Sequence, residues 1–368
     1  MSFENALLRE VLRSVDHLYG SGNWDEERFG KNYKDLAVPA IRATNSVLGK
    51  FHLALLPRQN FVGRVEELLG RYGDDLSDFY ERLEDPASKE LLLKLLCYRI
   101  LGHHQVWLPL NNEQYWRYRR DVGSLARAAP PVKIGFQNWK LRLFDVEPLG
   151  YPIRVYSVPI GIVEQFFMGH YAHAKGAVTV RAEEGDHVID AGGCWGETAL
   201  FFAHAVGPQG KVYTFEFVPE NLAVMEKNFA LNPELSSRVV ISRQPLWHTP
   251  DLALSFSSQG PGSKLRNSVD PAGTTLTSTI DACMAQGMAP RVDFVKMDIE
   301  GAELPALQGA VETIRKFKPK LAISVYHNSL EDFARIPSFL SGIGVPYRFF
   351  LSHATIHEEE TVLFAAPS

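Results

Sequence analysis

The sequence predicts an α/β protein whose mainly parallel β-sheet is covered by helices and closed by an antiparallel hairpin, preceded by a mostly helical N-terminal region. From Val178 onward, short apolar runs typical of buried strands alternate with segments of helical spacing. Such alternation builds parallel sheets through right-handed crossovers. Two final apolar runs follow each other with no helix between them, which indicates a hairpin. Residues 1–130 show helical spacing instead.

The N-terminal helices are predicted from spacing and end signals. Apolar residues recur at helical intervals over 61–69 and 76–83. Asp85 followed by proline is typical of a helix start, and the apolar helix expected over 87–101 ends at Gly102. We expect these segments to form the core of a helical region.

The period changes after the paired prolines at 130–131, where we place a boundary. Residues 139–144 and 153–156 alternate between apolar and polar side chains and predict a hairpin, and a short helical stretch is expected over 165–171. The predicted organisation is a helical region over 1–130, a hairpin and connecting helix over 131–176, and the main α/β domain over 177–368.

The main domain is predicted as strands and helices in alternation. We expect strands near 187–191, 211–216, 238–243, 292–298 and 320–326, helices near 197–206, 219–230, 303–315 and 330–341, and the closing hairpin at 347–351 and 361–365.

Composition excludes several classes of protein. The 368 residues are 45% hydrophobic and 22% charged, which is typical of a globular protein. A net charge of −5 offers no basic field for nucleic acid. No run approaches the roughly twenty apolar residues that span a bilayer, and the start MSFENALLRE does not resemble a signal peptide. The three cysteines are scattered, so we expect a reducing cytoplasm.

One segment predicts a ligand. The strand expected at 187–191 runs into a glycine turn and then a helix, and Glu216 ends the next strand, twenty residues beyond Gly196. At that distance a crossover brings the second strand beside the first, and a carboxylate there can accept both hydroxyls of a ribose. The alternative is an ordinary strand, turn and helix without a ligand. An acid that ends an apolar strand is hard to explain by packing, so we favour a ribose-bearing ligand.

The glycine spacing narrows the choice of ligand. Ala191 stands where a dinucleotide site has its first glycine, and Asp190 adjoins the turn. A carboxylate there would repel a pyrophosphate but not an ammonium or a sulfonium group. S-adenosylmethionine (SAM) carries both, together with a carboxylate that suits a helix N-terminus. A nicotinamide dehydrogenase is therefore disfavoured.

Several separated segments resemble the FkbM-type methyltransferases. They are VIDAGGCWGET (188–198), FEFVP (215–219), VDFVKMDIEGAE (292–303) with LQGA (307–310), and ETVLF (360–364). The resemblance covers about residues 160 to 368, and 83–102 is similar to a region that often precedes the domain. It implies a Rossmann-like class I methyltransferase sheet, SAM as cofactor, and O-methylation of a sugar, glycan or polyketide hydroxyl. Cys194 departs from the asparagine that is common in the family.

The candidate cofactor residues follow the first three strands. Asp190 could hold the turn or the SAM ammonium, and Glu197 and Thr198 could cap their helix or contact the methionine part. Leu246 or Trp247 could lie on the adenine, with Gln244 at its edge, although core packing explains Leu and Trp equally well. The complete set is Asp190, Gly192, Gly193, Gly196, Glu197, Thr198, Glu216, Phe217, Gln244 and Leu246.

The candidate catalytic residues follow the fourth and fifth strands. We expect Asp298 to face the methyl group or the acceptor, and His327 to take the proton of an acceptor hydroxyl, the alternative being a loop histidine. Asp298, Glu300 and Glu303 could hold Mg²⁺. Helix N-terminal acids explain the two glutamates as well, so we expect no metal. His170, Tyr171 and His173 could line a lid, although packing or surface roles are simpler.

The sequence thus predicts a SAM-dependent methyltransferase that acts on a hydroxyl oxygen. The alternatives are an N-methyltransferase and a non-catalytic SAM-binding module with a helical interaction region. The expected partner is a small-molecule or glycan acceptor, with no nucleic acid and no membrane span. Residues 1–130 could select the acceptor, cover the site or form a homodimer.

Overall fold

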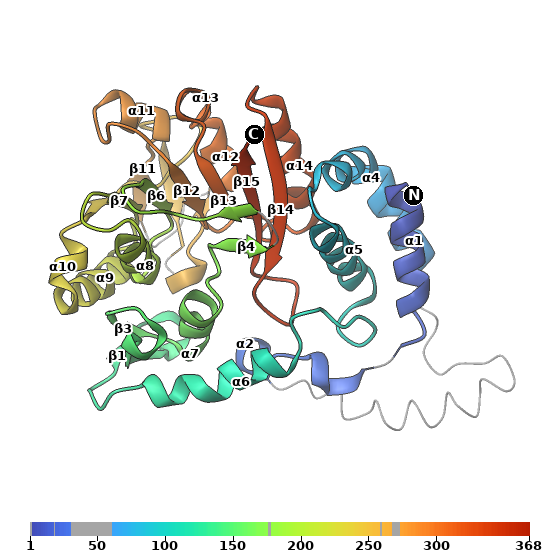
Figure 1. Ribbon diagram of the computed structural model, residues 1–368, viewed down its shortest axis with the longest axis horizontal. Coiled ribbons are helices and arrows are strands. Elements are labelled where there is room, and N and C mark those ends of the chain that lie inside the picture. Colours follow the sequence, from blue (N-terminus) through green and yellow to red (C-terminus); the bar gives the residue numbers. More distant parts are fainter. Residues whose placement is uncertain (1, 18, 31–60, 176–177, 258–259, 267–272) are drawn as a thin grey trace, which may run out of the picture.

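The computed structural model describes residues 2–17, 19–30, 61–175, 178–257, 260–266 and 273–368. Its main sheet has seven strands in the order β14-β15-β13-β12-β6-β7-β8 (Figure 1), which confirms the predicted fold class. The strands are β6 (His187–Ala191), β7 (Lys211–Phe215), β8 (Val239–Ser242), β12 (Phe294–Met297), β13 (Lys320–Ser324), β14 (Tyr347–His353) and β15 (Thr361–Pro367).

Strand direction and register place the loops that matter at one edge. The strands β8, β7, β6, β12 and β13 are parallel, and β15 runs antiparallel to both β13 and β14. Ala191 pairs with Phe215 on one side and with Met297 on the other, so the carboxyl ends of β6, β7 and β12 are level. In open parallel sheets, ligands bind beside these ends.

The crossover helices match the prediction except at one place. The expected helix over 303–315 is interrupted near Gly309, where an added Cβ would lie 2.2 Å from the Trp247 carbonyl oxygen. Only glycine allows this close approach of two backbones, and the helix restarts two residues later. The helices are α8 (Glu197–Ala205), α9 (Pro219–Leu231), α12 (Glu303–Gln308), α13 (Val311–Phe317) and α14 (Leu330–Gly342).

Two small sheets and one added strand go beyond the prediction. The expected hairpin is present as β2 (Lys140–Asp145) and β3 (Arg154–Ser157), and β1 (Val132–Lys133) pairs with β2. The strands β4 (His173–Lys175) and β5 (Val178–Val180) form a two-stranded sheet. The predicted boundary at 176/177 lies outside the described residues.

Between β8 and β12 the chain forms a second unpredicted sheet, whose short strands carry little apolar alternation. Its elements are β9 (Ala253–Phe256), β10 (Leu265–Arg266) and β11 (Thr274–Leu276), followed by α11 (Ile280–Ala285). The helical stretch predicted at 165–171 lies earlier, as α7 (Pro159–Ile162) and a π-turn, η7 (Val163–Phe167).

The N-terminal region is helical as predicted. The segments at 61–69 and 76–83 belong to one helix, and Asp85 caps the next one through the Ser88 N–H at 2.8 Å. That helix ends at Gly102, whose φ of 85° favours glycine. The helices are α1 (Phe3–Ser14), α2 (Glu26–Phe29), α4 (Phe61–Arg82), α5 (Pro86–Leu101) and α6 (Glu113–Asp121).

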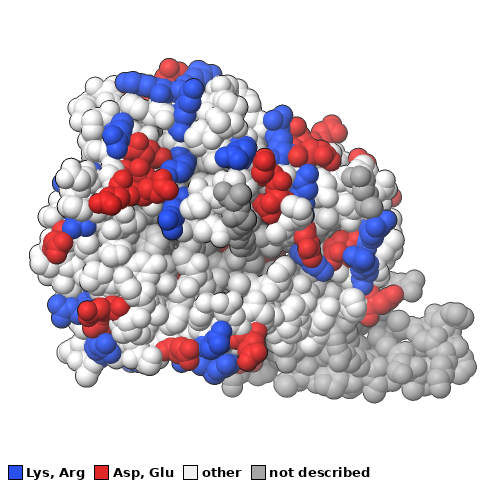
Figure 2. All heavy atoms as spheres, viewed as in Figure 1, with Lys and Arg blue, Asp and Glu red and all other residues white. Residues whose placement is uncertain are grey.

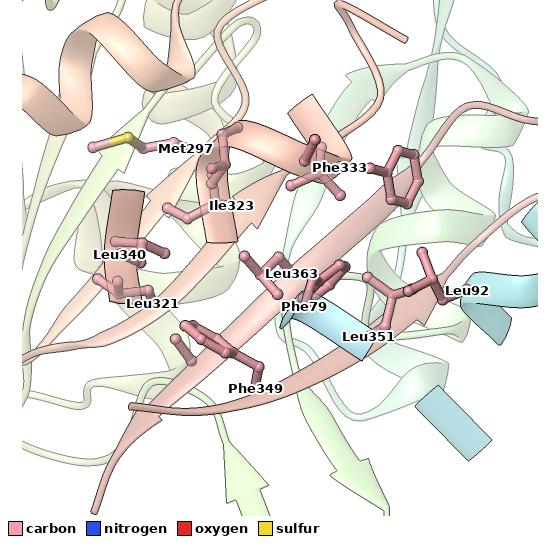
Figure 3. Packing of buried hydrophobic residues seen from close by; sticks show 14 of the residues in the cluster. Phe79, Leu92, Met297, Leu321, Ile323, Phe333, Leu340, Phe349, Leu351 and Leu363 are labelled. Atoms are coloured by element: carbon pink, nitrogen blue, oxygen red, sulfur yellow. The ribbon is translucent and has the colours of Figure 1, made fainter. Parts of the chain in front are cut away.

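The N-terminal helices share a hydrophobic core with the sheet. Figure 3 shows Phe79 of α4 and Leu92 of α5 beside Leu351 of β14, and all three are buried. The Leu351 N–H donates to Ser88 Oγ at 2.9 Å. Edge strand β14 is therefore covered by helices rather than left open to pair with another chain.

The surface carries charges of both signs. On the face shown in Figure 2, lysines and arginines are interspersed with acids and form no single basic patch. Among the described residues, no helix combines the length and apolarity needed to span a membrane.

Candidate functional site

A cavity of about 400 Å³ opens at the carboxyl edge of the parallel strands. The loops after β6, β7, β12 and β13 supply its floor, through Gly192, Glu216, Asp298 and Tyr326. Phe29 of α2 lines it from the N-terminal region. The cavity therefore joins parts of the chain that are far apart in sequence.

The glycine turn after β6 packs its backbone closely against the backbone of Asp298 and of Phe215. At Gly192 φ is +84°, and an added Cβ would lie 1.8 Å from the Asp298 carbonyl oxygen. The Gly192 N–H and the Gly193 N–H both donate to the Phe215 carbonyl oxygen, at 3.1 and 3.0 Å. Side chains are excluded here, so a ligand in the cavity can approach the main chain directly.

A buried ion pair lies beneath the turn. Asp190 and Lys296 come from adjacent strands, and their side chains are 0% and 1% exposed with Nζ 3.2 Å from Oδ1. Lys296 Nζ also donates to the Gly192 carbonyl at 2.6 Å. Thr198 and Thr214 donate to the Asp190 carboxylate at 2.9–3.1 Å. Asp190 is thus occupied by protein groups and holds the turn in place.

Glu216 lines the cavity with a carboxylate that several protein groups hold in place. Its Oε1 accepts the N–H groups of Phe217 and Val218, at 2.7 and 2.8 Å, and its Oε2 accepts from the Asn221 side-chain amide at 3.3 Å. The Cys194 backbone also bonds this carboxylate. Burial raises the pKa of Glu216 to about 7, against the lowering effect of these hydrogen bonds.

Asp298 is a buried anion at the opposite side of the turn. Tyr171 donates to its Oδ2 at 2.6 Å, and His327 Nε2 lies 3.3 Å from Oδ1. Burial alone would raise the pKa of Asp298, but the charges of His327 and Lys296 and the Tyr171 hydrogen bond lower it to about 2. The carboxylate is therefore ionised at neutral pH.

His327 is enclosed by acids. Its Nδ1 lies 2.9 Å from Glu303 Oε1, and its Nε2 lies 3.7 Å from Glu300 Oε1. Burial alone would lower the pKa of His327, but the charges of Glu303, Asp298 and Glu300 outweigh it and raise the pKa to about 10. The imidazole carries its proton at neutral pH, so the expected role as a proton acceptor does not fit these contacts.

Two other glutamates in the cavity wall titrate near neutrality. Burial raises the pKa of Glu300 to about 7, although the His327 charge opposes this, and its side chain is 22% exposed. Burial likewise raises the pKa of Glu197, at the start of α8, to about 7. Glu300 is the better placed of the two to exchange a proton with a molecule beside Asp298.

The family follows from a comparison of the sequence with known domains. Residues 180–348 match the family model described as the methyltransferase FkbM domain. This part of the chain is a methyltransferase FkbM domain. It is accordingly a SAM-dependent methyltransferase domain.

One solved structure supports this fold. The chain is similar to methyltransferase FkbM from Methylobacillus flagellatus KT, with 17% identity and a TM-score of 0.52 over 88% of this chain and 70% of that one. A weaker similarity is to Aeropyrum pernix fibrillarin with bound SAM, with 11% identity and a TM-score of 0.36 over 66% of this chain and 100% of that one. No curated protein matches the sequence.

The FkbM domain brings most of the predicted site residues to the cavity. Its wall includes Gly192, Glu197, Thr198, Glu216, Phe217, Leu246 and Asp298. Outside the wall are Asp190, Gly193, Gly196, Gln244 and His327. Of the three lid candidates, His170 and Tyr171 line the cavity, whereas His173 packs against the rings of Phe350 and Phe364.

Within the described residues, Asp298, Glu303 and His327 form the one group with spacing suited to a metal ion. Glu303 already accepts the N–H groups of Ile299 and Gly301, at 2.8 and 3.0 Å. These bonds and its contact with His327 give Glu303 a structural role, because they fix the backbone of the loop after β12. The absence of a metal stays a prediction.

Three residues that contribute to the site of the FkbM domain were not predicted from the sequence. Lys296 was visible as a lone lysine in an apolar strand, and that is a signal for a buried charge. Glu360 and Phe29 gave no comparable local signal, because they reach the cavity from the last strand's loop and from α2.

Proposed function

We propose that the protein transfers the methyl group of SAM to a hydroxyl oxygen of a small-molecule or glycan acceptor. The observation that carries the proposal is the arrangement of acids around the glycine turn. Glu216 lies on one side, and Asp298 and Glu300 lie on the other, all in the wall of one cavity. Such a site offers a place for the ribose at one end and for an acceptor at the other.

In this proposal, the cavity beside the turn holds SAM. Glu216 would accept hydrogen bonds from the ribose hydroxyls, and Phe217 and Leu246, both in the cavity wall, would hold the adenine. The side-chain-free backbone at Gly192 lets the methionine part approach the start of α8, where N–H groups favour its carboxylate. Asp298 is ionised and supplies negative charge near the sulfonium.

The methyl transfer itself needs little covalent help. A bond forms between the acceptor oxygen and the methyl carbon as the carbon–sulfur bond breaks, and the sulfur keeps the electron pair as the thioether of S-adenosylhomocysteine. In-line positioning of the two reactants is worth as much as ~7–11 kcal/mol of barrier.

The hydroxyl proton passes to the Glu300 carboxylate. Its pKa of about 7 makes it a base matched to neutral pH, and its position in the cavity wall gives it access to the acceptor. His327, already protonated and behind the wall, orients Asp298 and Glu300 by charge. This assignment replaces the base role that we expected for His327.

N-methylation is the nearest rival, because a neutral amine attacks without prior loss of a proton. The acid at Glu300 favours oxygen, since only a hydroxyl requires a proton acceptor during the attack. A non-catalytic SAM-binding module is the other rival, and it would have no use for a carboxylate that titrates near pH 7 beside the acceptor position.

The test is mass spectrometry of pooled hydroxyl and amine compounds incubated with methyl-labelled SAM. We expect label on hydroxyl oxygen, and we expect Glu300→Gln to lower kcat by roughly 10²–10⁴ with SAM affinity unchanged. Glu331→Gln, an exposed acid paired with Arg335 on α14, is the matched control. Label on nitrogen alone, full activity of Glu300→Gln, or SAM binding without turnover would each contradict the proposal.

A further inference from the structure

We propose that Arg99 of α5 is a positioning residue for methyl transfer, because it binds two loops that enter the cavity from different strands. One loop follows β13 and carries Tyr326 and His327, and the other joins β14 to β15 and carries Glu360. This inference rests on the proposed function, since it concerns the acids at the acceptor end of the same cavity. It gives the helical N-terminal region a task in the reaction.

Arg99 contacts both loops directly. Its Nη1 donates to Ser329 Oγ at 3.0 Å, and its Nη2 donates to the Glu358 carbonyl oxygen at 3.1 Å. The guanidinium carbon lies 5.3 Å from the centre of the Phe333 ring, which is labelled in Figure 3, and the Arg99 side chain is 7% exposed. The planar fork of an arginine holds two acceptors at a fixed spacing, so Arg99 sets the distance between the two loops.

Each loop has a residue of unfavourable backbone conformation close to its contact with Arg99. At Ser329 φ is 57°, and at Glu360, two residues beyond Glu358, φ is 60°. Side chains other than glycine rarely adopt positive φ, and such conformations persist where neighbouring contacts hold them. The Ser329 hydroxyl makes no capping bond to α14 and accepts the Arg99 bond instead. Arg99 therefore holds both loops at points where the backbone would otherwise relax.

On the cavity side, the same two loops meet. Tyr326 OH, from the first loop, lies 3.1 Å from Glu360 Oε1, in the second loop, and 3.4 Å from Asp298 Oδ1. All three residues line the cavity. A change in the spacing of the loops would therefore move the groups beside the acceptor position.

A second path leads from Arg99 to Glu300, the proposed base. Asn328, adjacent to Ser329, donates from Nδ2 to the Gly301 carbonyl oxygen at 3.1 Å. Glu300 precedes Gly301 and also has a positive φ, of 58°. Arg99 is not among the described residues that line the cavity, so it acts through these contacts and not on the reactants.

The first experiment measures label transfer from methyl-labelled SAM to the pooled hydroxyl compounds, per folded molecule. We expect Arg99→Met to lower kcat about thirtyfold with KM for SAM within about twofold, because a misplacement of ~1 Å costs as much as ~10²-fold in rate. Arg99→Lys keeps the charge without the fork and should recover less than about half of the loss on a logarithmic scale. Arg71→Met is the control, an exposed arginine of α4 that lines the same outer cavity as Arg99.

Three outcomes of this experiment would overturn the proposal. They are wild-type kcat in Arg99→Met, full activity of Arg99→Lys, and an equal loss in Arg71→Met. A purely structural role for Arg99 would lower the folded fraction and leave kcat per folded molecule unchanged.

The second experiment is a double-mutant cycle with Ser329→Ala, which removes one acceptor of the Arg99 fork. We expect Ser329→Ala alone to lower kcat about threefold, and to lower it by less than about twofold when added to Arg99→Met. Fully additive losses would show that the bond to Ser329 does not carry the effect.

The third experiment needs no acceptor and follows hydrogen exchange in the complex with S-adenosylhomocysteine. The amides of Gly301, Asn328 and Ala354 are each hydrogen-bonded in the cavity loops. We expect them to exchange at least about tenfold faster in Arg99→Met and at the wild-type rate in Arg71→Met. Unchanged exchange in Arg99→Met would overturn the proposal. Faster exchange and a lowered kcat in Arg99→Met, together with a fully active Glu300→Gln, would support Arg99 and count against the proposed base alone.

Discussion

Replacing Lys296 by methionine tests the buried pair on which the glycine turn rests. Methionine keeps an unbranched side chain of similar length but removes the charge and the donors. Asp190, which is 0% exposed, then loses its cation, and the Ala191 and Gly192 carbonyls lose bonds of 3.1 and 2.6 Å. Breaking a buried pair by removing one partner costs about 3–5 kcal/mol, because the other charge stays buried.

A loss of that size is a large part of the 5–15 kcal/mol that typically stabilises a folded protein. The measurement is the free energy of unfolding from denaturant titrations followed by tryptophan fluorescence. Lys320→Met on the neighbouring strand is the matched control, because that lysine is 19% exposed and should cost under about 1 kcal/mol. Adding Asp190→Asn to Lys296→Met should recover part of the loss. If Lys296→Met costs no more than the control, the turn does not depend on the pair.

Two further predictions concern SAM affinity, both measured by calorimetry. Gly192→Ala should weaken binding more than a hundredfold, because its Cβ would lie 1.8 Å from the Asp298 carbonyl oxygen; binding within tenfold of wild type would show that the turn adjusts. Glu216→Gln should weaken binding about tenfold, or ~1.4 kcal/mol. Since burial raises the pKa of Glu216 to about 7, and the ionised carboxylate is the better ribose acceptor, wild-type affinity should rise as pH rises through about 7, and that rise should be missing in Glu216→Gln.

Local patterns were sufficient to predict most of the fold. The five inner strands of the main sheet, β15, β13, β12, β6 and β7, lie between neighbours and are mostly buried, so each is an apolar run that sequence patterns detect. The interruption at Gly309 could not be foreseen, because it depends on the Trp247 backbone, 62 residues earlier in the chain. The sheet of β9, β10 and β11 was missed because strands of two to four residues carry too little alternation to show a period.

The same limit applies to the site. Gly192, Glu216 and Asp298 follow directly from strand ends, and the level register of the parallel strands brings them to one cavity. The protonation of His327 depends on three carboxylates that the fold brings around it. Sequence spacing does not show that all three lie within reach of one imidazole. Phe29 is more remote still, because only the tertiary fold brings α2 to the loop that carries His357.

The structure gives Asp190 a different role beside the glycine turn from the one that its sequence position suggests. Asp190 cannot repel a pyrophosphate as the sequence suggested, because Lys296 neutralises it and its oxygens are taken by Thr198 and Thr214. The acids that face the cavity at this end are Glu197 and Glu216. A pyrophosphate beside these two glutamates would raise their pKa and favour their protonated forms, which are weaker acceptors for the ribose hydroxyls. A sulfonium ligand would instead favour their ionised forms. We therefore attribute the expected selectivity against dinucleotides to Glu197 and Glu216 in the cavity wall, while Asp190 holds the turn.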